Sequence, residues 1–215
     1  AMRYWDFFPA EDGWGRIPVW GFGEVAESRS SHVAVGERFF GYFPMGAELV
    51  ITAGWADDEA VVDTASHRAE MAKAYSRYAR CSVDPVYRAD REREQLLLYP
   101  LFMTAFLIDD LLGGAGDFGA EQIVVSSASS KTAIGVAHCA RRRAVRTVGL
   151  TSVAHLGFVE DLDVYDEVWA YDDIDTLADR PSAFVDIAGN VDVRLAAHRH
   201  LADGLRYSMT VGNTH

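Results

Sequence analysis

The chain has 215 residues, of which 49% are hydrophobic and 24% charged, and its formal net charge is −12. These values exclude a disordered chain and are typical of one large or two small globular domains with a real core. The acidic balance argues against a nucleic-acid or anionic-membrane partner, and no apolar run approaches membrane-spanning length. Because Cys81 and Cys139 are the only cysteines, no disulfide framework is predicted, and we expect a cytoplasmic location.

The first hundred residues divide into two parts by composition. Short runs of β-branched and aromatic residues, broken by glycines, predict a small β-domain within residues 1–56. The charged stretch that follows is helix-prone, and we expect residues 57–97 to form a helical connecting segment. Pro100 is expected to open a helix at its first turn, and the apolar run 101–112 then ends at a pair of glycines.

From residue 120 onward, strand-like and helix-like segments alternate. The predicted strands are 122–126, 145–150, 166–170, 183–187 and 205–211. The predicted helices are 131–142, 153–161 and 191–201, with a short piece near 173–178. This alternation predicts an α/β domain over residues 98–215, with a parallel sheet that helices cover on both faces.

One turn in this domain is the most informative about function. The small residues 126–130 lie between a predicted strand and a predicted helix, where free backbone amides and the positive helix end favour a bound phosphate. A second β-rich unit follows at once, as it does in dinucleotide sites. The turn contains no glycine, but serine hydroxyls can bond a phosphate or cap the helix, and Lys131 adds a cation. The alternative interpretation is a capped helix without a ligand.

Several segments, in the right order, resemble the medium-chain dehydrogenases/reductases, above all their quinone-oxidoreductase-like members. They are residues 18–27 and 35–41 for the catalytic-domain core, 100–112 for the helix with the pattern P-x-x-x-T-A, 123–141 for the phosphate-binding turn and helix, and 183–189 and 205–212 for two later strands. The aromatic residues 4–9 resemble an uncharacterised bacterial branch of that superfamily. The resemblance implies a Rossmann-like nucleotide-binding domain at 98–215, preceded by a partial GroES-like β-domain, in a chain truncated at both ends.

The resemblance also implies an NADP(H)-dependent, zinc-independent oxidoreductase acting on a small carbonyl, enone or quinone. The expected cofactor contacts are Thr104, Ser127, Ser129, Ser130, Lys131, Thr132, Thr151, Ser152, Gly189, Val211 and Gly212. NADP(H) is preferred to NAD(H) because no acidic residue that would hold the ribose hydroxyls follows the strand at 145–150. Tyr4 and Trp5 are the expected substrate contacts.

No catalytic residue and no metal site are assigned. Zinc-free relatives transfer hydride mainly by holding the acceptor close to the nicotinamide, so a catalytic dyad need not be visible in the sequence. Glu24 matches a glutamate position of the zinc-dependent relatives, but no cysteine lies near it, and a structural role fits better.

Two other functions stay open. One is a non-catalytic scaffold or interaction module that kept the fold and lost the cofactor, and the other is a binder of a different nucleotide or a phosphorylated metabolite. The unfinished sheet would leave an exposed edge, so we also expect a homo-oligomer formed through the last strand or the small domain.

Overall fold

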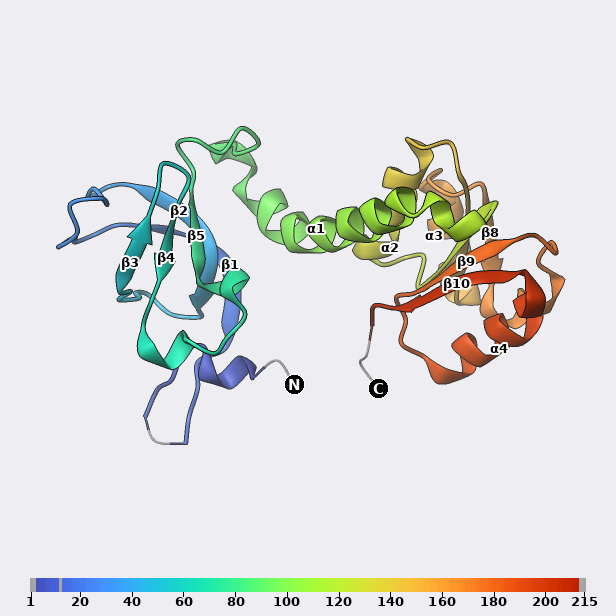
Figure 1. The fold of residues 1–215 in the computed structure, drawn as a ribbon, viewed down its shortest axis with the longest axis horizontal. Helices are drawn as coiled ribbons and strands as arrows, with labels where there is room; N and C mark the ends of the chain where they lie inside the picture. Colours follow the sequence, from blue (N-terminus) through green and yellow to red (C-terminus); the bar gives the residue numbers. More distant parts are fainter. Residues whose placement is uncertain (1–2, 12, 213–215) are drawn as a thin grey trace. The chain divides into compact units, whose positions relative to one another are not determined.

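The computed structural model describes residues 3–11 and 13–212, except for the side chains of Tyr4, Trp55 and Ala56. The chain forms two compact units, Ala1–Leu97 and Leu98–His215 (Figure 1). The second unit begins at the residue where the Rossmann-like domain is predicted to begin.

The first unit is built on an antiparallel sheet of five strands. They are β1 (Pro18–Glu24), β2 (Arg38–Pro44), β3 (Ala53–Ala56), β4 (Ala60–Asp63) and β5 (Arg77–Arg80), in the order β1-β2-β5-β4-β3. Short 3-10 turns accompany them: η1 (Tyr4–Asp6), η2 (Ser66–Arg68), η3 (Lys73–Ser76) and η4 (Ala89–Arg91). Because side chains alternate along β2, Phe39 joins one buried cluster with Val61 and Tyr78, whereas Tyr42 joins another with Phe7.

The structure corrects the predicted helical segment at 57–97. Strands β4 and β5 lie inside it, and helix begins only near its end. Val61 pairs with Tyr78 across the two strands, and both side chains are almost fully buried. Burial against the rest of the sheet therefore outweighs the helix propensity of the neighbouring charged residues.

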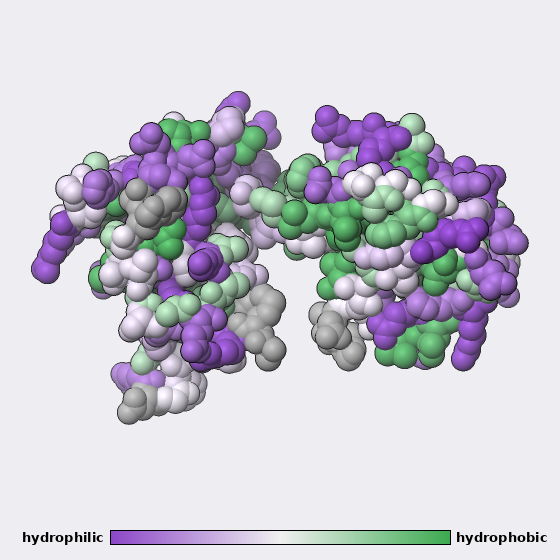
Figure 2. All heavy atoms as spheres, in the orientation of Figure 1, coloured by the Kyte–Doolittle hydropathy of each residue, from purple (hydrophilic) through white to green (hydrophobic). Residues whose placement is uncertain are grey.

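The long helix α1 (Glu92–Gly114) also starts earlier than expected. Pro100 lies inside it rather than at its first turn, and the Thr104 hydroxyl donates a hydrogen bond to the Pro100 carbonyl at 3.1 Å. Only Ala105, Ile108 and Leu112 are buried, and Figure 2 shows apolar (green) side chains gathered along this helix.

The segment Ala89–Gly114 is long and apolar enough to cross a membrane by length and composition, and an 18-residue window within it has a mean hydropathy of 1.6. This differs from the expectation that no run reaches that length. A single helix of this kind is weak evidence for a membrane span.

The second unit confirms the α/β prediction. Its strands are β6 (Gln122–Ser126), β7 (Arg146–Thr151), β8 (Glu167–Ala170), β9 (Ser182–Asp186) and β10 (Leu205–Thr210), all parallel, in the order β10-β9-β6-β7-β8. The helices are α2 (Lys131–Arg141), α3 (Leu156–Asp161) and α4 (Val191–Leu201), with 3-10 turns η5 (Gly116–Gly119), η6 (Val153–His155), η7 (Tyr171–Thr176) and η8 (Ala202–Gly204).

Both faces of this sheet are covered, as the alternating pattern predicts. Ile123 and Val125 of β6 pack with apolar residues of α1 and α2, whereas Val124 packs on the other face with residues of α4 and η7. The chain runs outward from β6 to β7 and β8 on one side, and to β9 and β10 on the other. The strand order therefore reverses between β6 and β9, and such a switch point is where open parallel sheets bind ligands.

Candidate functional site

The β6–α2 turn lies at this switch point. Ser127 opens the turn in the left-handed region, with a φ of 55°. Ser130 is the N-cap of α2, and its hydroxyl accepts a hydrogen bond from the Ala133 amide at 3.3 Å. A serine thus takes the backbone conformation that glycine adopts most easily, and a second serine starts the helix.

Some of the turn's amides already have partners within the protein. The Ser127 amide donates to the Tyr171 hydroxyl at 2.9 Å, the Ala128 amide to the Leu150 carbonyl at 3.0 Å, and the Ser130 amide to the Ser127 carbonyl at 2.8 Å. These bonds define the shape of the turn. They also make the Ser127 and Ser130 amides poorer candidates for a ligand than the sequence suggests.

Three other amides stay available. Within residues 3–11 and 13–212, the backbone N–H groups of Ser129, Lys131 and Thr132 have no acceptor. They lie at the start of α2, where the helix dipole favours an anion, and the Lys131 side chain is exposed beside them. This part of the turn has the chemistry to hold a phosphate group.

Two tyrosines that the sequence analysis missed support the turn. The Tyr165 hydroxyl donates to the Ala128 carbonyl at 3.0 Å, and Tyr171 receives the Ser127 amide. Burial raises the pKa of both phenols, and the charge of Asp186 raises that of Tyr171 further. Both therefore remain neutral hydrogen-bonding groups at physiological pH. In the sequence, the only sign of a role for Tyr165 and Tyr171 is that they flank the predicted strand 166–170.

Asp186, at the end of β9, is a third residue that sequence reasoning did not assign to the site. Its side chain is fully buried, and Oδ1 accepts hydrogen bonds from the Ser126 hydroxyl at 2.9 Å and the Gly189 amide at 3.0 Å. Its main-chain carbonyl accepts from the amides of Val211 and Gly212. Asp186 thereby brings three predicted residues, Gly189, Val211 and Gly212, to the strand end beside the turn.

The remaining predicted cofactor residues are less available. Thr151 is buried at the end of β7, and the Ser152 hydroxyl lies 2.8 Å from Nδ1 of His155. The Thr104 hydroxyl is bonded within α1. A ligand would have to replace the Ser152–His155 bond to use that hydroxyl.

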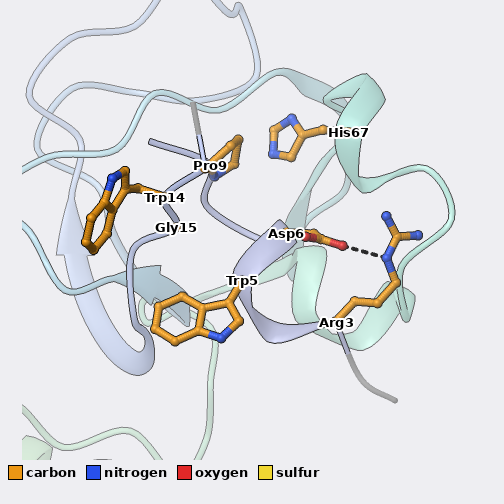
Figure 3. A pocket seen from close by; sticks show the side chains of 8 residues that line it. Arg3, Trp5, Asp6, Pro9, Trp14, Gly15 and His67 are labelled. Atoms are coloured by element: carbon orange, nitrogen blue, oxygen red, sulfur yellow. Dashed lines mark hydrogen bonds and ion pairs between the residues drawn. The ribbon is translucent and has the colours of Figure 1, made fainter. Parts of the chain in front are cut away.

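Trp5 lies in the first unit, at a cavity of about 750 Å³ (Figure 3). The lining residues are Arg3, Trp5, Asp6, Pro9, Gly13, Trp14, Gly15 and His67. The indole-bearing residues Trp5 and Trp14 are 62% and 77% exposed, although such large rings are usually more buried. The side chain of Tyr4, the other predicted substrate contact, lies outside what is described.

In the described part of the chain, no group of three or more His, Cys, Asp or Glu side chains is placed to hold a metal ion.

Ser127 has a strained backbone, because it holds a side chain in the left-handed region. Ser127→Gly is expected to raise the free energy of unfolding by about 1 kcal/mol, because a side chain in the left-handed region costs roughly that much. Ser129→Gly is the matched control, since Ser129 is not in that region, and it is expected to lower stability slightly. Urea unfolding of both variants measures the difference, and equal effects would contradict the interpretation.

The second unit thus has a Rossmann-like parallel α/β fold, with the β6–α2 turn at the switch point of its sheet. The chain belongs to the family described as "Protein of unknown function (DUF2855)", whose profile matches residues 1–215. No curated protein matches the sequence.

Solved structures share the fold at low identity. One is a protein proposed to be an NADPH:quinone reductase from Mesorhizobium loti, with 12% identity, a TM-score of 0.53, and coverage of 87% of this chain and 51% of that one. Another is the yhdH oxidoreductase of Salmonella enterica in complex with NADP, with 14% identity, a TM-score of 0.53, and coverage of 96% and 59%. The chain thus spans between half and three fifths of the length of these structures, and such identities establish the fold alone.

Proposed function

We propose that the protein is an NADP(H)-dependent oxidoreductase of a small carbonyl, enone or quinone that works without zinc. The observation that carries the proposal is the set of three unpartnered amides, those of Ser129, Lys131 and Thr132, at the switch point of a parallel sheet. Lys131 adds a positive charge beside them. Amide donors at a helix start together with a cation are well suited to bind a diphosphate.

In this proposal each part of the site has its own task. Ser129, Lys131 and Thr132 bind the pyrophosphate, while Ser127 and Ser130 keep the turn open through their bonds within the protein. Thr151 and Ser152 lie on the side of the adenosine ribose. Gly189, Val211 and Gly212 line the path toward the nicotinamide, and Thr104 contacts the cofactor from α1. The bound nicotinamide supplies or accepts the hydride.

The preference for NADP(H) rests on the end of β7. Thr151 ends that strand and Ser152 follows it, where an NAD-type site would place an acidic residue. A 2′-phosphate would therefore meet no carboxylate at these two positions. We propose Trp5 as a substrate contact, because its exposed indole lines the cavity of the first unit and offers an apolar face with one N–H donor. Tyr4 is proposed with it from the sequence resemblance.

The test is calorimetric titration of the protein with NADPH and with NADH. We expect NADPH to bind, and Lys131→Ala to weaken its binding about tenfold, with a smaller salt dependence, because a point charge on the pyrophosphate is lost. Lys73→Ala is the matched control, since Lys73 is the only other lysine and lies on the surface of the first unit. It should leave the dissociation constant unchanged. Absence of binding at millimolar NADPH would exclude the enzyme.

One observation favours a second candidate, the non-catalytic module. The amides of Ser127, Ala128 and Ser130 are satisfied within the protein, so the turn is stable without any ligand. A module of this kind would bind neither cofactor. Binding of other phosphorylated metabolites without nicotinamide preference would indicate the third alternative.

A cytoplasmic location and a homo-oligomer remain predictions. β10 is an edge strand of its sheet as described, which is the feature that motivates self-association.

A further inference from the structure

Two buried hydrogen bonds join β6 to β9, one at each end of the strands. At the amino end, the Gln122 side-chain amide donates to the Ser182 hydroxyl at 2.9 Å. At the carboxyl end, the Ser126 hydroxyl donates to the Asp186 carboxylate at 2.9 Å. All four residues are almost fully buried. The first pair is neutral, whereas the buried Asp186 carboxylate of the second carries a much larger desolvation cost.

The charge at the carboxyl end is compensated by an arginine from the next helix. Nη1 of Arg194, near the start of α4, lies 3.4 Å from Oδ2 of Asp186, and the Arg194 side chain is partly exposed. Oδ1 meanwhile accepts from Ser126 and from the Gly189 amide, and Gly189 has a φ of 66°. The carboxylate thus ties together the end of β6, the loop after β9 and the first turn of α4.

The hydrogen-bond network around Asp186 extends to the β6–α2 turn. The Ser126 hydroxyl also accepts from the Ala188 amide at 3.0 Å, so it cannot rotate without losing two bonds. The next residue, Ser127, holds the left-handed conformation from which the turn to α2 develops. A change in the backbone at Ser126 would therefore redirect the unpartnered amides of Ser129, Lys131 and Thr132.

We propose that Asp186 is a positioning residue: acting through Ser126, it holds the β6–α2 turn and the loop after β9 in the conformation that receives a pyrophosphate. Arg194 balances its charge, so that no unpaired carboxylate faces the incoming anion. This inference rests on the proposed function, because it assigns a task in cofactor binding. It concerns residues that make no contact with the cofactor themselves.

The positioning role can be tested by comparing the two ends of the β6–β9 pair. Ser126→Ala and Ser182→Ala each remove one buried hydroxyl that joins β6 to β9, and we expect similar losses of thermal stability. Only Ser126→Ala is expected to raise the dissociation constant for NADPH, by about tenfold, while Ser182→Ala stays within about twofold. If both variants change the affinity equally, or neither changes it, the positioning role is excluded.

A second measurement separates this inference from the proposed function. Hydrogen exchange without any ligand is expected to become faster in residues 127–132 and 187–190 for Ser126→Ala, but not for Ser182→Ala. If the wild-type protein binds no NADPH, the proposed function fails, and exchange still shows whether Ser126 holds the turn. Unchanged exchange there in Ser126→Ala would overturn the inference. Arg194→Met should weaken NADPH binding as well, because it leaves the Asp186 charge uncompensated, whereas Arg199→Met on the same helix should not.

Discussion

Arg68→Met is expected to lower the free energy of unfolding of the first unit by about 3–5 kcal/mol, because it leaves a buried carboxylate without its cation. The Arg68 and Asp63 side chains are only 1% and 2% exposed, and Nη1 lies 3.3 Å from Oδ2 of Asp63. Nη1 also donates to the Tyr78 hydroxyl at 3.1 Å, and Nε donates to the Phe7 carbonyl at 3.3 Å. Methionine fills similar space but replaces none of these bonds.

Urea unfolding followed by circular dichroism measures the loss, and hydrogen exchange of β4 and β5 locates it in the first unit. Arg77→Met is the matched control. Arg77 lies 3.3 Å from Glu59, but that pair is largely exposed, so its loss should cost less than about 1 kcal/mol. A similar cost for both variants would show that the buried pair contributes no more than a surface pair.

Arg68→Met also tests what stabilises the wall of the cavity lined by Trp5 and Trp14. Besides bonding the Phe7 carbonyl, the Arg68 guanidinium lies 4.5 Å from the centre of the Phe8 ring. Phe7 and Phe8 are buried, and they join the exposed Trp5 to the segment that carries Trp14. We therefore expect the loss of Arg68 to loosen the wall of this cavity before the sheet unfolds.

Gly149→Val is expected to destabilise the second unit by about 3 kcal/mol and to weaken NADPH binding, because the side chain has no room beneath the turn. A Cβ at this buried position in β7 would lie 2.9 Å from the Cβ of Ala128 and 3.0 Å from Cγ of Tyr165. Tyr165 and Ala128 are hydrogen-bonded to each other, so the steric clash can be relieved only if the turn itself moves.

Gly157→Val is the control for this substitution. No atom lies within 4 Å of a Cβ at Gly157, which is exposed in α3, so the free energy of unfolding should change by less than about 0.5 kcal/mol. Thermal unfolding and NADPH titration of both variants make the comparison. Unchanged affinity in a folded Gly149→Val protein would show that displacement of Ala128 does not reach the ligand-binding amides.

The second unit was predictable because its signals are local. Each strand and helix there has its own apolar period, and Ser130, the N-cap, marks the start of α2 directly before Lys131. The first unit was harder to predict. The charged stretch containing Val61 and Tyr78 favours helix locally, and only pairing across the sheet makes both segments strands.

The amino-acid sequence alone determined the α/β order of elements and the position of the β6–α2 turn with Lys131 beside it. Both can be read from patterns that span only a few neighbouring residues. The tertiary structure decided which amides of that turn stay free, and which residues support them. Tyr171 is 44 residues from Ser127 along the chain, and Asp186 is 60 from Ser126. Such contacts exist only once parallel strands bring their carboxyl ends together, and no local pattern in the sequence encodes them.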